Sequence, residues 1–172
     1  IRDTLTGLNT LHSLSIIHCD VKPENIVNIP RSNGRVKLID LGSCAIVNNI
    51  QAPYAQSRYY RAPEVAFRLA YGPKADIWST GCVAAELMLG LPLFPADTER
   101  HLICLINQML GPYPPSIRNA TTRYDELFLP DEQLKSPEQI CLENEENFTS
   151  FLPYFVQEHL DDIIMNFSFD EN

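Results

Sequence analysis

The pair Asn33-Gly34 constrains the fold of this chain most strongly, because it stands between two short runs of β-branched and aliphatic residues. The runs cover residues 26–29 and 36–39, and an Asn-Gly pair between such runs is the strongest short-range signal for a β-hairpin. In an antiparallel hairpin, the residue that enters the first strand lies beside the residue that leaves the second. We therefore expect Asn25 and Asp40 to lie side by side at the open end of the hairpin.

The rest of the chain predicts helices joined by irregular connections. Leucines recur at helical spacing near the beginning, Gly90 is placed to end one helix, and Thr98 is placed to cap the next. A capping box with proline at the first helical position begins at Ser136. Residues 16–25 and the proline-rich residues 113–135 are expected to be irregular. The expected helices cover residues 1–14, 75–89, 98–110, a segment from 136 onward, and 152–167.

The chain has 172 residues, of which 45% are apolar, and this is the size and composition of one folded domain. An apolar stretch over residues 77–94 has the length of a membrane span. Glu86 and Pro92 interrupt this stretch, so we interpret it as a core helix. The elements together predict a mainly α fold (α+β) with one short β-hairpin.

Charge is divided unevenly along the chain, although the net charge is −9. The residues up to Arg123 include 12 basic and 9 acidic side chains, whereas the residues from Asp125 onward include one basic and 13 acidic side chains. The negative total argues against nonspecific binding of nucleic acid or of an anionic membrane. A polyanionic ligand should bind the first part. The acidic end is either a solvated insert or a docking surface for basic substrates.

The cysteines indicate an intracellular protein, in the cytoplasm or the nucleus. Their number is odd, no two form a C-x-x-C pair, and no secretory signal opens the chain, so reduced thiols are expected. The five residues are Cys19, Cys44, Cys82, Cys104 and Cys141.

Four polar side chains converge on the open end of the predicted hairpin. Asp20 and Lys22 lie on the approach to Asn25, and Asp40 follows the second strand. Carboxylate and amide oxygens suit Mg²⁺, which completes its shell with water and substrate phosphate. A lysine and a free carboxylate nearby meet the needs of phosphoryl transfer. An isolated Asp-x-Lys is commonly solvated surface and an isolated Asp-x-Gly a turn, but their joint placement around one hairpin favours the functional interpretation.

The motifs that surround this constellation resemble those of protein kinases. Residues 18–25 read H-C-D-V-K-P-E-N and resemble the catalytic loop, and the D-L-G at 40–42 resembles the magnesium-binding D-F-G. The A-P-E at 62–64 resembles the end of the activation segment. The D-I-W-S-x-G at 76–81 is similar to the start of the central helix of the large lobe. The resemblance is close over residues 1–118 and loose beyond.

Within protein kinases, two further segments resemble the CMGC group: S-R-Y-Y-R-A-P-E at 57–64 and G-L-P-L-F-P at 90–95. Cys19 replaces the usual arginine of the catalytic loop, and residues 54–58 read Y-A-Q-S-R. These features are similar to the dual-specificity tyrosine-regulated (DYRK) kinases and the homeodomain-interacting (HIPK) kinases, with splicing kinases a close third.

The resemblance implies ATP and Mg²⁺ as cofactors and protein Ser/Thr hydroxyls as substrates, with tyrosine autophosphorylation in addition. It implies that Asp20 accepts a hydrogen bond from the substrate hydroxyl, that Lys22 contacts the γ-phosphate, and that Asn25 and Asp40 hold Mg²⁺. The other implied roles are adenine contact for Val27, support of the catalytic aspartate for Ser57, packing at the D-L-G for His18, Leu41 and Gly42, an ion pair for Glu64 whose usual arginine partner is missing, and acceptance of catalytic-loop N–H groups by Asp76.

Tyr54 is a candidate regulatory residue, because Arg58 and Arg61 follow it four and seven residues later. A phosphate on Tyr54 would gain charge-assisted hydrogen bonds from these guanidinium groups, each of about 1.5–3 kcal/mol. The spacing matches the activating tyrosine of the resembling family, although Ala52 occupies the position of its second tyrosine. The alternative is an aromatic residue that only packs.

The sequence lacks the small-lobe motifs of a kinase, since none of its seven glycines lies two residues from another. We therefore expect residues 1–172 to be a partial kinase domain, a large lobe truncated at both ends and inactive alone, with residues 113–150 as a CMGC-type insert. The competing hypothesis is a pseudokinase or a kinase-like interaction module. The intact catalytic set argues against it, because decay usually removes one of its members: Asp20, Lys22, Asn25 and Asp40.

Overall fold

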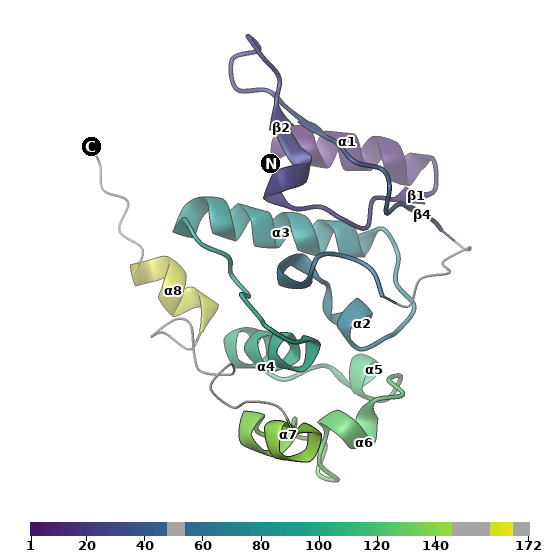
Figure 1. Cartoon of the computed structure of the whole chain (residues 1–172), viewed down its shortest axis with the longest axis vertical. Coiled ribbons are helices and arrows are strands. Elements are labelled where there is room, and N and C mark those ends of the chain that lie inside the picture. Colours follow the sequence, from purple (N-terminus) through teal and green to yellow (C-terminus); the bar gives the residue numbers. More distant parts are fainter. Residues whose placement is uncertain (48–53, 146–158, 167–172) are drawn as a thin grey trace. The chain divides into compact units, whose positions relative to one another are not determined.

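The computed structural model describes residues 1–47, 54–145 and 159–166, so Ala52 and the first part of the helix expected over 152–167 lie outside the described residues. The chain divides into two compact units, Ile1–Leu93 and Phe94–Asn172 (Figure 1). Helices predominate in both, and the named strands form two short antiparallel pairs in the first unit. The predicted mainly helical fold class is thus confirmed.

The elements of each unit follow the chain in order. The helical elements of the first unit are α1 (Arg2–Ser13), η1 (Pro23–Asn25), η2 (Arg58–Tyr60), α2 (Pro63–Ala66) and α3 (Lys74–Leu89). Its strands are β1 (Ile16–Ile17), β2 (Ile26–Asn28), β3 (Val36–Leu38) and β4 (Ala45–Ile46). The helices of the second unit are α4 (Glu99–Leu110), α5 (Pro115–Arg118), α6 (Tyr124–Leu127), α7 (Pro137–Asn144) and α8 (Leu160–Asn166).

The hairpin predicted from Asn33-Gly34 is present as the antiparallel pair β2–β3, in which Ile26 faces Leu38. The turn uses positive backbone φ angles, 54° at Asn33 and 80° at Gly34, which Asn and Gly adopt with little strain. The ladder continues one step beyond the named strands, because the Ile39 amide donates to the Asn25 carbonyl at 2.9 Å. Asn25 therefore lies opposite Ile39, and Asp40 is the next residue along the chain.

The second strand pair corrects the irregular structure that we expected over residues 16–25. Ile16 pairs with Ile46 and Ile17 with Ala45, and the 3-10 turn η1 follows before β2 begins. Strands of two residues are too short to leave an alternating pattern, and the partner of β1 lies almost thirty residues away in the chain. The local sequence therefore did not predict strands β1 and β4.

Helix α3 ends as predicted at Gly90, which adopts a left-handed φ of 75°. Its apolar character is not evidence of burial on all sides, since Ile77 and Leu87 are 48% and 69% exposed. Its buried side carries Asp76 at its N-terminal end and Ser79 one turn further on. Among the described residues, no helix is long and apolar enough to cross a membrane.

The second unit confirms the capping signals of the sequence. Thr98 caps α4 by accepting the His101 amide, and Ser136 and Gln139 form the predicted capping box of α7. The proline-rich region expected to be irregular contains the short helices α5 and α6. These four-residue helices carry too few periodic positions to be predicted.

Arg123 organises an ion network in the second unit, and its side chain is only 5% exposed. Its guanidinium group contacts Glu99 at 2.7 Å and Glu126 at 2.8 Å, and Arg100 contacts Glu126 at 2.7 Å. Hydrogen bonding from Arg123, with the charges of both arginines and against the effect of burial, lowers the pKa of Glu126 to about 2. The network thus joins α4 to α6.

Replacing Glu126 by Gln is expected to lower the free energy of unfolding by about 1–3 kcal/mol at neutral pH, because Arg123 loses one of its two charged partners and keeps only Glu99. The folded-state pKa is depressed from 4.5 to about 2, so the contribution of Glu126 is complete above pH 4.5 and disappears as the pH falls towards 2. Denaturant unfolding of both proteins between pH 7 and 3 measures this. The control is Glu132→Gln, whose ion pair with Arg118 is 58% exposed on the glutamate side. A difference between wild type and variant that does not shrink below pH 4.5 would contradict the assignment.

Candidate active site

The carboxylate of Asp20 is the centre of a compact polar cluster in the first unit. Its Oδ1 accepts a hydrogen bond from Ser57 Oγ at 2.7 Å, and its Oδ2 forms an ion pair with Lys22 Nζ at 2.9 Å. Asn25 Nδ2 donates both to Asp20 Oδ2 at 3.0 Å and to the Asp20 carbonyl at 2.8 Å. Lys22 Nζ also donates to Ser57 Oγ at 3.1 Å. A segment 37 residues downstream in the sequence thus completes the cluster.

The interactions within this cluster favour the ionised forms of Asp20 and Lys22. Burial disfavours the Asp20 anion, but the hydrogen bonds from Lys22 and Ser57 outweigh it and hold the pKa of this carboxyl below its ordinary value. The hydrogen bond to Asp20 raises the pKa of Lys22 against its burial, and the charges of Glu24 and Asp40 add to the rise. A carboxylate and an ammonium group therefore face each other at neutral pH.

The peptide that precedes Asp20 is held by the buried carboxylate of Asp76. Its Oδ2 accepts the His18 amide at 2.8 Å and its Oδ1 accepts the Cys19 amide at 2.9 Å. His12 Nε2 from α1 lies 2.7 Å from the same Oδ2. Asp76 is 0% exposed, so these contacts replace water completely. Sequence reasoning missed His12, because no local signal joins residues 64 positions apart.

Cys19 adopts a left-handed φ of 64° in this loop and is 2% exposed. Burial, with a smaller effect of the Asp76 charge, raises the pKa of its thiol to about 11. The side chain at this position is therefore neutral and offers no charge to an activation-segment phosphate.

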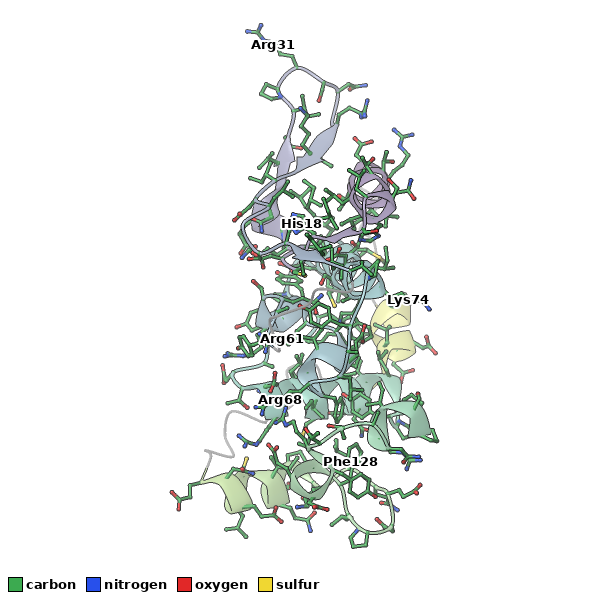
Figure 2. All side chains as sticks on the ribbon, turned by 90° about the vertical axis from the view of Figure 1, so that its right-hand side faces the viewer. His18, Arg31, Arg61, Arg68, Lys74 and Phe128 are labelled. Carbon is green, nitrogen blue, oxygen red and sulfur yellow. The ribbon has the colours of Figure 1, made fainter. Side chains whose placement is uncertain are left out.

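Asp40 follows the hairpin with a φ of 65°, and its Oδ1 accepts the Gly42 amide at 3.1 Å. A Cβ atom on Gly42 would lie 3.1 Å from that same oxygen, so a larger residue here would require the Asp40 carboxylate to shift slightly. The ring of His18 ties this segment to the Asp20 loop, because Asp20 N donates to its Nδ1 at 3.3 Å and its Nε2 lies 3.0 Å from the Ile39 carbonyl. Figure 2 shows His18 below the hairpin whose tip carries Arg31.

The donor chemistry at the open end of the hairpin fits Mg²⁺ completed by other ligands. Asn25 uses its Nδ2 as a donor, so its Oδ1 is the atom left to ligate, and Asp40 has a second carboxylate oxygen. Within residues 1–47, 54–145 and 159–166, no group of three His, Cys, Asp or Glu side chains forms a metal cage. Mg²⁺ is typically held by one or two carboxylates together with waters and substrate phosphates. Val27 and Leu41 nearby are 36% and 56% exposed.

Tyr54 lies over the guanidinium group of Arg61, whose Cζ atom is 3.8 Å from the centre of the ring. Tyr54 is 60% exposed, whereas Arg61 is 1% exposed and donates to the carbonyls of Ala55 and Gln56 at 2.9 Å. Hydrogen bonding from Arg61, against burial, and the charge of Arg58 lower the pKa of the Tyr54 phenol. The spacing of the tyrosine and the two arginines does bring the three side chains together.

Glu64 makes no side-chain ion pair within the part of the chain that the structure describes. Gln56 was not singled out from the sequence, yet it is 7% exposed and forms hydrogen bonds with three separate segments. A glutamine between an alanine and a serine carries no local signal of such a role.

A model of the protein kinase domain matches residues 1–159. This match covers most of the chain, and the chain therefore belongs to the protein kinase family. The described elements are those of its mainly helical large lobe, with the short hairpin at the Asp20 cluster.

Curated relatives narrow the comparison to kinases of the DYRK and HIPK type. The serine/threonine-protein kinase ppk15 of Schizosaccharomyces pombe is 40% identical over 170 residues, 95% of this chain and 32% of the relative. The dual specificity tyrosine-phosphorylation-regulated kinase 2 of Drosophila melanogaster is 44% identical over 121 residues, 70% of this chain and 17% of the relative. Homeodomain-interacting protein kinase 4 of Homo sapiens is 44% identical over 129 residues, which cover 72% of this chain and 21% of the relative. The chain thus spans less than two thirds of the length of each of these relatives.

Proposed function

We propose that this protein transfers the γ-phosphate of ATP to serine and threonine hydroxyls of other proteins, and that it also phosphorylates its own tyrosine. The observation that carries the proposal is the cluster of Asp20, Lys22, Asn25 and Ser57 beside Asp40. The names of its relatives support the same activity. In this proposal residues 113–150 form a CMGC-type insert. The spacing of the five cysteines, which includes no C-x-x-C pair, supports an intracellular location.

The residues of the cluster have distinct tasks in this proposal. Asp20 accepts a hydrogen bond from the substrate hydroxyl and aligns its oxygen for attack, while Ser57 fixes the orientation of the carboxylate. Lys22 neutralises charge on the transferring phosphoryl group. Asn25 and Asp40 would hold Mg²⁺, which supplies charge neutralisation at the phosphates when it is bound. Val27 would contact the adenine.

The protein at its full natural length is the right sample for the test, because the chain spans only part of the relatives that it matches. Incubation with radiolabelled ATP, Mg²⁺ and a library of Ser/Thr peptides is expected to label peptides, and EDTA is expected to abolish the labelling. Binding of ATP without any transfer to peptides or proteins would favour the alternative of a pseudokinase.

In the same proposal, Tyr54 is the activating phosphorylation site. Its ring already lies against Arg61, and Arg58 contributes positive charge at the phenolic oxygen. A phosphate added to that oxygen would receive hydrogen bonds from both guanidinium groups. Since Arg61 also donates to the Ala55 and Gln56 carbonyls, these bonds would order the segment that leads to Ser57.

Replacing Tyr54 by Phe is expected to lower kcat at least about tenfold, because two charge-assisted bonds of about 1.5–3 kcal/mol each cannot form. Phosphatase treatment should reduce the wild-type kcat to the level of the variant and leave the variant unchanged. The control is Tyr59→Phe, which alters another exposed tyrosine in the same segment. Equal kcat values for wild type and Tyr54→Phe, before and after phosphatase, would rule out this regulation.

A further inference from the structure

Gln56 uses every polar group it has, although it is only 7% exposed. Its backbone amide donates to the Cys19 carbonyl at 3.0 Å, which ties it to the loop that carries Asp20. Its side-chain Nε2 donates to the Ala75 carbonyl and to Ser79 Oγ, both at 2.8 Å, on α3. Its Oε1 accepts the Ala62 amide at 2.9 Å.

A relay of hydrogen bonds extends this anchorage to the following turn. Ser79 Oγ accepts from Gln56 Nε2 and donates to the Tyr60 carbonyl at 2.7 Å. The Gln56 carbonyl accepts from Arg61 Nη2 at 2.9 Å. The segment that contains Ser57 is therefore fixed to α3 and to the Asp20 loop through one residue. Element η2 begins directly after Ser57, and α2 begins directly after Ala62.

The backbone conformation of Gln56 indicates that these contacts hold the residue in place. Its φ is 64°, a left-handed conformation that favours glycine and that a long side chain adopts only when its surroundings hold it there. Glycine would remove the strain but also the side-chain hydrogen bonds to Ala75, Ser79 and Ala62. The side chain, rather than backbone freedom, accounts for the residue at this position.

Ser57 is the next residue, and its hydroxyl donates to Asp20 Oδ1 at 2.7 Å. We propose that Gln56 is a positioning residue for phosphoryl transfer, which sets the place of Ser57 and through it the orientation of the Asp20 carboxylate. The inference rests on the proposed kinase function. As a positioning residue, Gln56 contacts neither the substrate nor the nucleotide and acts only through Ser57.

The test is a double-mutant cycle in the full-length protein that joins Gln56→Met with Ser57→Ala. Gln56→Met keeps the length of the side chain and removes its hydrogen bonds, and kcat is expected to fall about 10- to 100-fold. The KM for ATP is expected to stay within about twofold. In a background that already carries Ser57→Ala, the same substitution should lower kcat by less than about threefold, because the residue through which it acts is gone.

The cycle separates positioning from a loss of folded protein. If Gln56→Met only reduced the folded fraction, kcat would fall by the same factor in both backgrounds, and that result would overturn the inference. If Gln56→Met folds too poorly to assay, Ser79→Ala takes its place, since it removes one acceptor of the Gln56 amide. Its smaller loss should also disappear in the Ser57→Ala background. Gln108→Met on α4 is the matched control, a half-buried glutamine in the second unit.

Hydrogen exchange provides a readout that does not require activity. Backbone amides of residues 54–62 are expected to exchange faster in Gln56→Met than in wild type and unchanged in Gln108→Met. Unchanged exchange in Gln56→Met would overturn the inference even if the wild type proved inactive. An inactive wild type with faster exchange in the variant would instead overturn the proposed kinase function and leave the anchoring of Ser57 by Gln56 standing.

Discussion

Replacing Asp20 by Asn is expected to lower kcat by about two to four orders of magnitude, the usual contribution of a positioned acid–base group. The amide keeps the shape of the carboxylate but not its charge. Lys22 Nζ and Asn25 Nδ2 both direct donors at Asp20 Oδ2. If Nδ2 of the new amide occupies the position of Oδ2, it faces the two donors Lys22 Nζ and Asn25 Nδ2. If it occupies the position of Oδ1 instead, the Ser57 hydroxyl loses its acceptor. Either orientation disturbs the cluster and replaces the negatively charged acceptor for the substrate hydroxyl by a neutral amide.

Steady-state kinetics of the full-length protein measure this effect, with KM for ATP expected to change much less than kcat. Asp131→Asn is the control, because Asp131 is exposed and its side chain only accepts the amide of Gln133. A kcat of the Asp20→Asn variant above one tenth of the wild-type value would show that the reaction does not depend on this carboxylate. The proposed role of the cluster would then have to be abandoned.

Local signals predicted the parts of the fold that local chemistry determines. Asn33-Gly34 predicted the hairpin, and through the antiparallel register it also brought Asn25 to the segment that leads into Asp40. Gly90 and Thr98 predicted helix ends in the same way, because a left-handed C-terminal residue and a side-chain cap are properties of single positions.

Contacts between distant segments were not predictable in this way. The approach of His12 to Asp76, the pairing of β1 with β4, and the bonds of Gln56 to α3 join residues whose separation leaves no periodic pattern. The family resemblance supplied the role of Asp76 and the candidate Tyr54, but not the hydrogen bonds of Gln56. Residues that are important because of what they touch at long range therefore required the structure.

The second large effect is expected at Asp76, where replacement by Ala should lower the free energy of unfolding by about 3–5 kcal/mol. The carboxylate is completely buried and accepts two backbone amides, those of His18 and Cys19. Alanine leaves both N–H groups without an acceptor, and it leaves His12 without its carboxylate. Because these amides belong to the residues before Asp20, kcat should fall together with stability.

Asp161→Ala distinguishes this role from the ordinary effect of an acidic residue near a helix N-terminus. Asp161 is exposed in the first turn of α8, so its loss should cost only about 0.3–1 kcal/mol. Asp76→Asn should give an intermediate loss, because an amide oxygen still accepts one of the two backbone amides. Denaturant unfolding followed by circular dichroism measures all three. If Asp76→Ala and Asp161→Ala lowered stability equally, Asp76 would be no more than a helix-terminal acid, and the Asp20 loop would have to be held in place by its other contacts.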